Sequence, residues 1–207
     1  GSFWIGTGMG LDRYERSTGI FTHIVDPTEP QGATSANVEA IFEDSDGFLW
    51  VGTADAGAYR FDRKNNTFRY YKTDPSDPKS LSHNLVMAIY QDVQGIIWMA
   101  TGGGGLNKYN PETDSFTFFT ERQGLPNNFI YCIIPDEQNN LWLTTNFGIS
   151  RFDPRTETFE NYTTSDGLQS NEFNSNACAR SANGDIYVGG TLGINLFNPS
   201  KISTSSY

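Results

Sequence analysis

Polar side chains that could contact a small polar ligand recur at one place in a repeated segment. Four asparagines, Asn37, Asn84, Asn128 and Asn171, each precede a short segment of the same type. An amide can hydrogen-bond a sugar hydroxyl, and it can equally cap its own loop by bonding nearby backbone. Two interpretations therefore stay open: a ring of ligand-binding amides near the axis of the fold, or a set of loop caps.

Further candidates stand in short connections whose sequence differs from copy to copy. Asp55 offers a carboxylate, Asn146 an amide and Phe147 an aromatic surface on which a sugar ring can stack, and His83 directly precedes Asn84. Because function concentrates on loops held by a rigid scaffold, we expect a ligand site on the face with the long loops. Its candidate residues are Asn37, Asp55, His83, Asn84, Asn128, Asn146, Phe147 and Asn171. For each of them, a variable solvated loop is the alternative.

Residue types used in catalysis do not gather into a motif. The two histidines, His23 and His83, have neither a neighbouring triad-like serine or cysteine nor metal-ligand spacing. Glycines 102–105 lack the Lys-Ser/Thr of a phosphate loop, and the acidic stretches 44–47 and 74–77 lack the remaining ligands of a calcium loop. We therefore expect no catalytic residue, no metal and no cofactor. A lyase-like enzyme using His83 and a carboxylate is the alternative.

A repeat of roughly 45 residues must position these side chains. Trp4, Trp50, Trp98 and Trp142 lie 46, 48 and 44 residues apart, and Tyr187 follows 45 residues later. These aromatics sit in the blocks FWIGT, LWVGT, IWMAT, LWLTT and IYVGG, which are followed by blocks such as GAYRF and TFRYY. Short blocks rich in β-branched and aromatic residues, bounded by Gly, Asn, Asp or Pro, are typical of strands. Four antiparallel strands in each period predict an all-β fold, the β-propeller.

The register of the repeat sets the expected domain organisation. We predict a β-propeller fragment over 1–199, with full blades at 37–73, 84–121 and 128–164, partial blades at 1–25 and 171–199, and a tail or linker at 200–207. This amounts to about eighteen strands and about four to five blade equivalents. In a closed ring, the last partial blade would supply only the one strand that the first partial blade lacks. It supplies three strands, which is more than closure of the ring requires. We therefore expect part of a larger, seven-bladed propeller.

Composition excludes several classes of protein. The 15 Phe, 10 Tyr and 4 Trp provide enough apolar area for a folded core. The balance of 14 basic against 24 acidic residues, net −10, with the basic residues scattered, argues against a nucleic acid partner. No run of about 18 apolar residues exists, and the first residues are not those of a signal peptide.

The two cysteines fall on equivalent strands of neighbouring blades. Cys132 aligns with Ala40 and Ala88, whereas Cys178 aligns one place later, with Ile41 and Ile89. Their side chains therefore point to opposite faces of those strands. In neighbouring blades, these two faces either lie against each other or point apart. We expect two free, buried thiols, with a disulfide as the alternative.

The consensus LWxGTxxGGLxRFDxxTxxFxxY, preceded by NxVxxIxxDxxG, resembles the two-component regulator propeller repeat. The match is most specific at residues 49–71 and 97–119, and it weakens in the last copy, where Tyr187 replaces Trp and Gly190 replaces Thr. In this family, such repeats form the extracytoplasmic sensor region of hybrid two-component histidine kinases of gut Bacteroides and similar bacteria.

The resemblance implies a function. It indicates a periplasmic sensor module of an inner-membrane protein, itself non-catalytic, that recognises a glycan or oligosaccharide and signals to a cytoplasmic kinase. The implied partners are an oligosaccharide or other small ligand and the remaining propeller blades of the same protein, with the membrane reached only through the full-length protein. A homodimer is left open. A propeller lyase, as in the more loosely similar streptogramin lyases, and a protein-binding scaffold are the alternatives.

Overall fold

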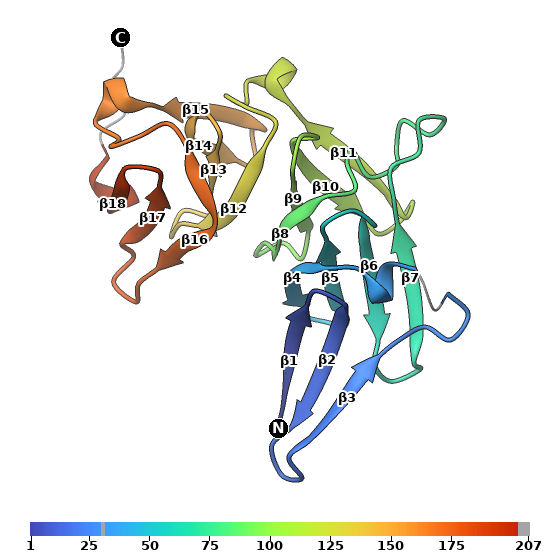
Figure 1. The fold of residues 1–207 in the computed structure, drawn as a ribbon. Coiled ribbons are helices and arrows are strands. Elements are labelled where there is room, and N and C mark those ends of the chain that lie inside the picture. The colour runs from blue at the N-terminus through green and yellow to red at the C-terminus, as the bar shows by residue number, and fades with distance from the viewer. Residues whose placement is uncertain (30–31, 203–207) are drawn as a thin grey trace. The chain divides into compact units, whose positions relative to one another are not determined.

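Five antiparallel β-sheets follow one another along the chain in the computed structural model, which describes residues 1–29 and 32–202 (Figure 1). The first sheet contains β1 (Ser2–Thr7), β2 (Gly10–Glu15) and β3 (Ile20–Ile24). The second contains β4 (Val38–Glu43), β5 (Leu49–Thr53), β6 (Ala58–Asp62) and β7 (Thr67–Tyr71). The third contains β8 (Val86–Gln91), β9 (Ile97–Thr101), β10 (Leu106–Asn110) and β11 (Ser115–Phe119).

The last two sheets complete the series. The fourth contains β12 (Ile130–Pro135), β13 (Leu141–Thr145), β14 (Gly148–Asp153) and β15 (Thr158–Tyr162), and the fifth contains β16 (Phe173–Arg180), β17 (Ile186–Gly190) and β18 (Gly193–Phe197). Short 3-10 helices lie in the connections: η1 (Ala33–Ser35), η2 (Glu121–Gln123), η3 (Thr164–Asp166) and η4 (Pro199–Lys201). Among the described residues, none of the helices is long and apolar enough to cross a membrane.

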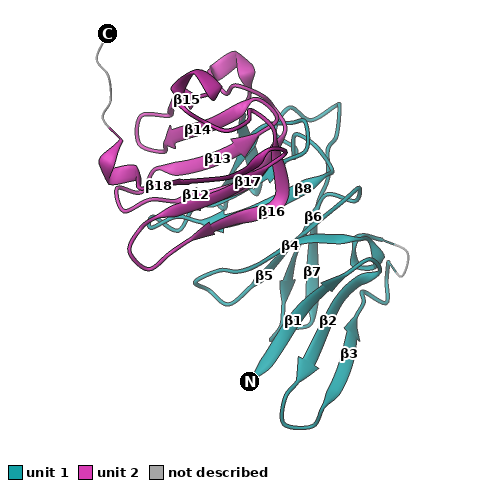
Figure 2. Cartoon of the chain, turned by 60° about the vertical axis from the view of Figure 1, so that its left-hand side comes forward, with its two compact units in different colours: residues 1–118 teal, residues 119–207 magenta. Residues whose placement is uncertain are grey.

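The chain divides into two compact units, residues 1–118 and residues 119–207 (Figure 2). Unit 1 holds the first three sheets, with β11 ending at its boundary, and unit 2 holds the last two. Strands that follow one another in sequence are neighbours in every sheet, with three strands in the first and last sheets and four in the others. The predicted all-β fold of four-stranded antiparallel propeller blades is confirmed.

The hairpin before each tryptophan block is fixed by one aspartate. Asp44 Oδ1 accepts the backbone N–H groups of Asp46 and Phe48, and Asp44 Oδ2 accepts Trp50 Nε1–H at 2.7 Å. The same indole-to-carboxylate hydrogen bond recurs between Trp98 and Asp92 and between Trp142 and Asp136, at 2.8 and 3.0 Å. The acidic stretch 44–47 therefore builds the turn between β4 and β5.

Tryptophan and glycine together set the packing of one blade on the next. The Trp50 ring, 1 % exposed, lies 5.0 Å from the ring of Tyr109 in the following sheet. A Cβ at Gly52 would lie 2.7 Å from the carbonyl oxygen of Val86, so any larger residue would push the two sheets apart. The repeated tryptophan packs between blade faces in both units, because Trp142 likewise lies 4.9 Å from Phe197.

The two cysteines form a disulfide, so the prediction of two free thiols was wrong. Cys132 on β12 and Cys178 on β16 are 46 residues apart and have Cα atoms separated by 6.6 Å. Cys132 pairs with Thr144 and Cys178 with Val188, which places the side chains on opposite faces of their own sheets. Where two sheets stack, those are the faces that meet. The disulfide therefore ties the fourth sheet to the fifth inside unit 2.

Candidate functional site

Three of the four predicted asparagines cap the loops that lead into the next blade. Each accepts, through its side-chain oxygen, the backbone N–H of a residue at the start of its own loop. The pairs are Asn84 with Thr73 at 2.8 Å, Asn128 with Glu121 at 2.8 Å and Asn171 with Thr164 at 2.9 Å. Asn37 differs, since its amide donates to Glu39 Oε1 at 2.7 Å. The loop-cap interpretation therefore describes the amide oxygens of Asn84, Asn128 and Asn171.

The backbone at two of these asparagines also holds the connection between β5 and β6. The carbonyl of Asn84 accepts the N–H of Gly57 at 2.8 Å, and the carbonyl of Asn37 accepts the N–H of Ala54 at 2.9 Å. Gly57 has a φ of +81°, and a Cβ there would lie 2.1 Å from the carbonyl oxygen of Tyr71. A glycine is therefore required at this position of the connection that carries Asp55.

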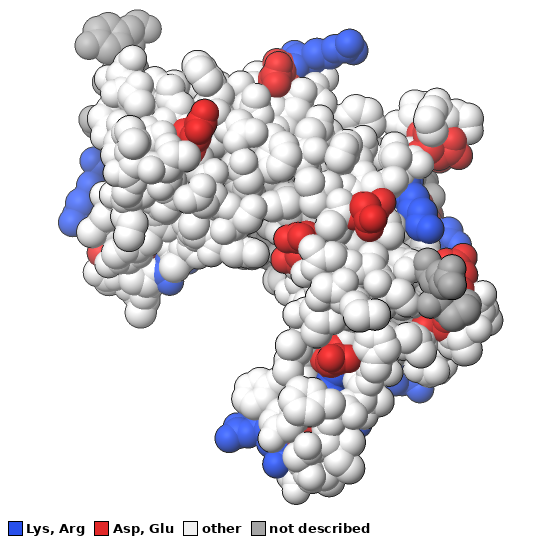
Figure 3. Space-filling view, viewed as in Figure 1, with Lys and Arg blue, Asp and Glu red and all other residues white. Residues whose placement is uncertain are grey.

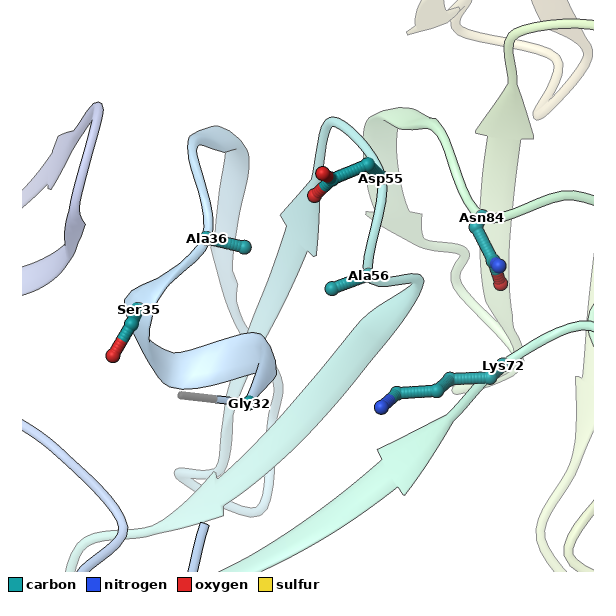
Figure 4. A pocket seen from close by; sticks show the side chains of 7 residues that line it. All are labelled: Gly32, Ser35, Ala36, Asp55, Ala56, Lys72 and Asn84. Carbon is teal, nitrogen blue, oxygen red and sulfur yellow. The ribbon is translucent and has the colours of Figure 1, made fainter. Parts of the chain in front are cut away.

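A pocket of about 470 Å³ opens where these loops meet in unit 1 (Figure 4). Its lining comes from the η1 loop, the β5–β6 connection, the end of β7 and the start of β8. The lining residues are Gly32, Ser35, Ala36, Asp55, Ala56, Lys72 and Asn84. Two predicted site residues, Asp55 and Asn84, are therefore brought together here.

The pocket presents hydrogen-bonding groups of every kind. Asp55 supplies an acceptor, Lys72 a charged donor, and Ser35 and Asn84 supply groups that both donate and accept. Asp55 and Lys72 are exposed, and Figure 4 shows the Lys72 side chain extending across the pocket from the end of β7. This arrangement suits a hydroxyl-rich ligand held by hydrogen bonds rather than an apolar one.

The predicted His83 lies on the loop between β7 and β8 but does not line this pocket. Its Nδ1 accepts the backbone N–H of Leu85 at 3.0 Å, so the ring caps its own loop. A Cβ at Gly104 would lie 2.9 Å from the Cβ of His83, which places the histidine against the β9–β10 connection.

A second group of predicted residues lies in unit 2 beside two aromatic side chains. Asn146 accepts the Tyr131 hydroxyl at 2.6 Å, and the rings of Tyr131 and Phe129 lie 4.8 Å apart. Burial, together with the charge of Glu172, raises the pKa of Tyr131, so this hydroxyl is a neutral donor at physiological pH. Phe147, next to Asn146, is 53 % exposed. The group combines aromatic surface with amide and hydroxyl donors and acceptors.

Sequence reasoning missed Ser35 and Lys72 in the first group and Phe129 and Tyr131 in the second. Lys72 could have been predicted, because its position differs between copies of the repeat: the next two blades have Thr120 and Thr163 there. Ser35 carries no such signal, since its counterpart in the next blade, two positions before Asn84, is also a serine, Ser82.

Charged groups are distributed without a concentrated patch on the face seen in Figure 3, where acidic and basic side chains stand singly or in small mixed groups. Within residues 1–29 and 32–202, no group of three or more His, Cys, Asp or Glu side chains is arranged to hold a metal ion.

Comparison with known proteins gives a consistent result. The family model described as Two component regulator propeller matches residues 32–55, 80–103 and 124–147. Histidine kinase P4 from Formosa agariphila is 28 % identical over 87 residues, which are 42 % of this chain and 6 % of the kinase.

Two solved structures from B. thetaiotaomicron are similar over almost the whole chain. Both are extracellular domains of putative hybrid two component systems. The first is 28 % identical, with a TM-score of 0.82, over 96 % of this chain and 26 % of the other. The second is 26 % identical, with a TM-score of 0.78, over 100 % of this chain and 30 % of the other.

The chain thus spans less than a third of each of these relatives. Its family match coincides with the ends of the long loops, the first strand of each full blade and the tryptophan block. Three segments of the chain thus match the two component regulator propeller model, and the chain is similar, in sequence and in fold, to the extracellular domains of putative hybrid two component systems.

Proposed function

We propose that this chain is a ligand-sensing, periplasmic module of a hybrid two-component sensor kinase and that it responds to an oligosaccharide without catalysing a reaction. The similarity to extracellular sensor domains supports the first part. The disulfide between Cys132 and Cys178 supports the location, because disulfides persist in oxidising compartments such as the periplasm. The kinase would lie in a part of the protein outside this chain.

The observation that carries the proposed ligand is the polar pocket of unit 1. Its carboxylate, ammonium, amide and hydroxyl groups stand on loops held by backbone hydrogen bonds to rigid strands. Neutral sugar hydroxyls can bond to all of these groups, whereas the chain's net charge of −10 opposes a heavily sulfated glycan. We place Asp55, Lys72 and Asn84 at the centre of this site and Asn37 and His83 on the adjoining loops.

The group in unit 2 is a second proposed contact surface for the ligand. Phe147 would stack on a sugar ring, with Asn146 beside it on the β13–β14 connection. Asn128 and Asn171 would contribute from the β11–β12 and β15–β16 connections. Exposed aromatic rings beside amides are a common way to bind carbohydrates, because the ring covers the apolar side of the sugar.

The proposed organisation keeps the boundaries expected from the repeat. It comprises a propeller fragment over 1–199, full blades at 37–73, 84–121 and 128–164, partial blades at 1–25 and 171–199, and a tail at 200–207. Further blades of the same protein are the proposed partners. The exposure of Phe3 (52 %), Phe21 (61 %), Ile194 (72 %) and Leu196 (58 %) supports this part, since apolar sheet faces of this kind normally pack against another surface.

Calorimetric titration against a panel of neutral and sulfated oligosaccharides tests the ligand. We expect saturable binding of a neutral member and about tenfold weaker binding in Asp55→Ala and in Lys72→Ala, because each change removes a direct hydrogen bond to the ligand. Lys79→Ala, an exposed lysine on the β7–β8 loop outside the pocket, is the matched control. Absence of heat with every member, or equal loss in the control, would contradict the proposal. Turnover of an added substrate that is abolished by His83→Ala would favour a lyase instead.

A further inference from the structure

One tight turn in unit 2 places an amide and an aromatic ring next to each other on a fixed backbone. Asn146 and Phe147 form the two-residue connection between β13 and β14, and both are exposed. The Phe147 N–H donates to Thr145 Oγ1 at 3.0 Å, and the same hydroxyl donates to the carbonyl of Gly148 at 2.9 Å. The Gly148 N–H donates to the carbonyl of Asn171 at 2.7 Å, so the loop before β16 also holds this turn.

A tyrosine on the neighbouring strand fixes the side chain of Asn146 as well. The Tyr131 hydroxyl, on β12, donates to Asn146 Oδ1 at 2.6 Å. The Tyr131 ring is half-buried and lies 4.8 Å from the ring of Phe129, which restricts its movement. The oxygen and nitrogen of an amide point in different directions. Because the oxygen is turned toward Tyr131, the NH2 group of Asn146 is the part that faces a ligand, and it can only donate.

Groups beside this turn complement the donor. The side-chain oxygen of Asn171 accepts the N–H of Thr164 at 2.9 Å, so its NH2 group too can face a ligand. Glu172 is exposed, and its charge adds to the effect of burial in raising the pKa of Tyr131, so the carboxylate lies close enough to interact with the tyrosine. We call this group of side chains the Asn146 surface; it consists of Tyr131, Asn146, Phe147, Asn171 and Glu172.

We propose that the Asn146 surface binds the acetamido group of an N-acetylated hexosamine, and that Tyr131 is a positioning residue that directs the Asn146 NH2 group toward it. The acetamido carbonyl accepts from this NH2 group, and the acetamido N–H donates to Glu172. The methyl group and the apolar side of the sugar lie on the Phe147 ring. The inference rests on the proposed function in assuming that the ligand is an oligosaccharide.

The orientation of the amide is what favours an acetamido group over a hydroxyl. A hydroxyl both donates and accepts, so it can bond to either end of an amide and does not need one end to face it. A carbonyl oxygen only accepts, and it requires the NH2 group. Sites built to hydrogen-bond one group bind an analogue that lacks this group much more weakly. The acetamido group is also neutral, so the net charge of −10 does not oppose it.

The test compares N-acetylchitotriose with cellotriose. These trimers share the same sugar ring and linkage, and they differ in carrying an acetamido group or a hydroxyl at the second carbon of each ring. Calorimetry measures the affinity, and residue-resolved NMR locates the binding. We expect the acetylated trimer to bind at least tenfold more tightly and to shift the signals of Asn146, Phe147 and Asn171, because cellotriose has no carbonyl for the amide donor.

Two variants separate positioning from a merely structural role. Tyr131→Phe keeps the ring and removes the hydroxyl, so the Asn146 amide can rotate. The preference for the acetylated trimer should fall about fivefold, and the side-chain NH2 signals of Asn146 should broaden. Asn146→Asp keeps an acceptor for the Tyr131 hydroxyl but removes the donor, and it should abolish the preference. Tyr187→Phe, an exposed tyrosine on β17, is the matched control and should change neither readout.

Four results would overturn the inference. These are equal affinity for the two trimers, no saturable binding of the acetylated trimer up to about 10 mM, shifts that fall away from the Asn146 surface, or a Tyr131→Phe variant that loses affinity for both trimers in the same proportion. Binding of neutral oligosaccharides without a preference for the acetamido group would leave the proposed function intact. Absence of heat with every oligosaccharide would contradict both.

Discussion

One aspartate in the hairpin of each four-stranded blade satisfies both the turn and the buried indole. In the second sheet, Asp44 accepts two backbone N–H groups of its turn and the Nε1–H of Trp50, whose side chain is 1 % exposed. A buried indole N–H without an acceptor costs free energy, so this carboxylate stabilises the blade contact as well as the hairpin. In the last blade, Ser181 stands in place of the aspartate and Tyr187 in place of the tryptophan.

Replacing this aspartate should therefore destabilise unit 1. We expect Asp44→Ala to lower the free energy of unfolding by about 2–3 kcal/mol, because the Trp50 N–H and the turn both lose their acceptor. Chemical denaturation of the variant and of Ser45→Ala, an exposed neighbour in the same turn, measures the effect. A loss below about 0.5 kcal/mol, or an equal loss in the serine control, would contradict this role.

A second carboxylate, which is only partly buried, links the second and third blades. Asp114 accepts the hydroxyls of Tyr71 and Tyr109, at 2.9 and 2.8 Å, and pairs with Arg69. Burial alone would raise the pKa of Asp114, but the hydrogen bonds from the two tyrosines and the arginine outweigh it and hold the pKa below its ordinary value of 3.8.

A carboxyl whose pKa is lowered by folding stabilises the protein when ionised. This contribution is complete above pH 3.8 and is lost as the pH falls through the lower value of the folded state. Asp114→Asn, which tolerates the left-handed backbone, should lower the free energy of unfolding by about 1 kcal/mol at neutral pH and flatten its decline in acid. Denaturation curves between neutral and acidic pH test this, with Asp46→Asn in an exposed turn as the control. A decline in acid as steep as that of the unmodified chain would argue against Asp114 as its source.

At the scale of strands and sheets, the repeat was sufficient to predict the order and position of the strands. Blocks such as LWVGT and TFRYY coincide with β5 and β7, because β-branched and aromatic residues bounded by turn residues leave few other conformations. The β-bulges near the start of β4, β8 and β12 were not predicted, since an extra residue in a ladder leaves no mark in the pattern of residue types.

The disulfide was also not predicted, for a geometric reason. The sequence correctly placed Cys132 and Cys178 on opposite faces of equivalent strands, but it could not decide whether those faces meet. The stacking of the fourth and fifth sheets brings their Cα atoms to 6.6 Å, within bonding range. Pairing across one repeat period then follows.

This cross-link should stabilise unit 2 substantially. Closing a loop of 46 residues lowers the entropy of the unfolded chain by an amount equivalent to about 4 kcal/mol. We expect the melting temperature of unit 2 to fall when a reductant is added, and Cys132→Ala with Cys178→Ala to match the reduced chain and to be unaffected by reductant. Detection of two reactive thiols in the denatured, unreduced chain would contradict the disulfide.

At the scale of the whole molecule, the propeller scaffold was predictable and the composition of the site only partly so. Asp55 was predicted because its connection differs between copies of the repeat, and Asn84 was predicted because an asparagine recurs at its position. Both residues line the pocket of unit 1. Ser35 was not found, because its counterpart in the next blade, Ser82, is the same residue type and the position therefore does not differ between the two copies. The residue type alone does not show whether an asparagine side chain faces a ligand or caps its own loop. In Asn84, Asn128 and Asn171 the side-chain oxygen accepts a backbone N–H of the loop.

The central claim is that the pocket of unit 1 binds a hydroxyl-rich ligand. The most direct measurement is residue-resolved NMR of the chain during titration with the neutral oligosaccharide that gives the largest calorimetric response. The account predicts that the largest shifts fall on Ser35, Asp55, Lys72 and Asn84 and their loop neighbours, saturating with one affinity. Shifts that leave these residues unchanged and fall on strands or loops away from the pocket would contradict it.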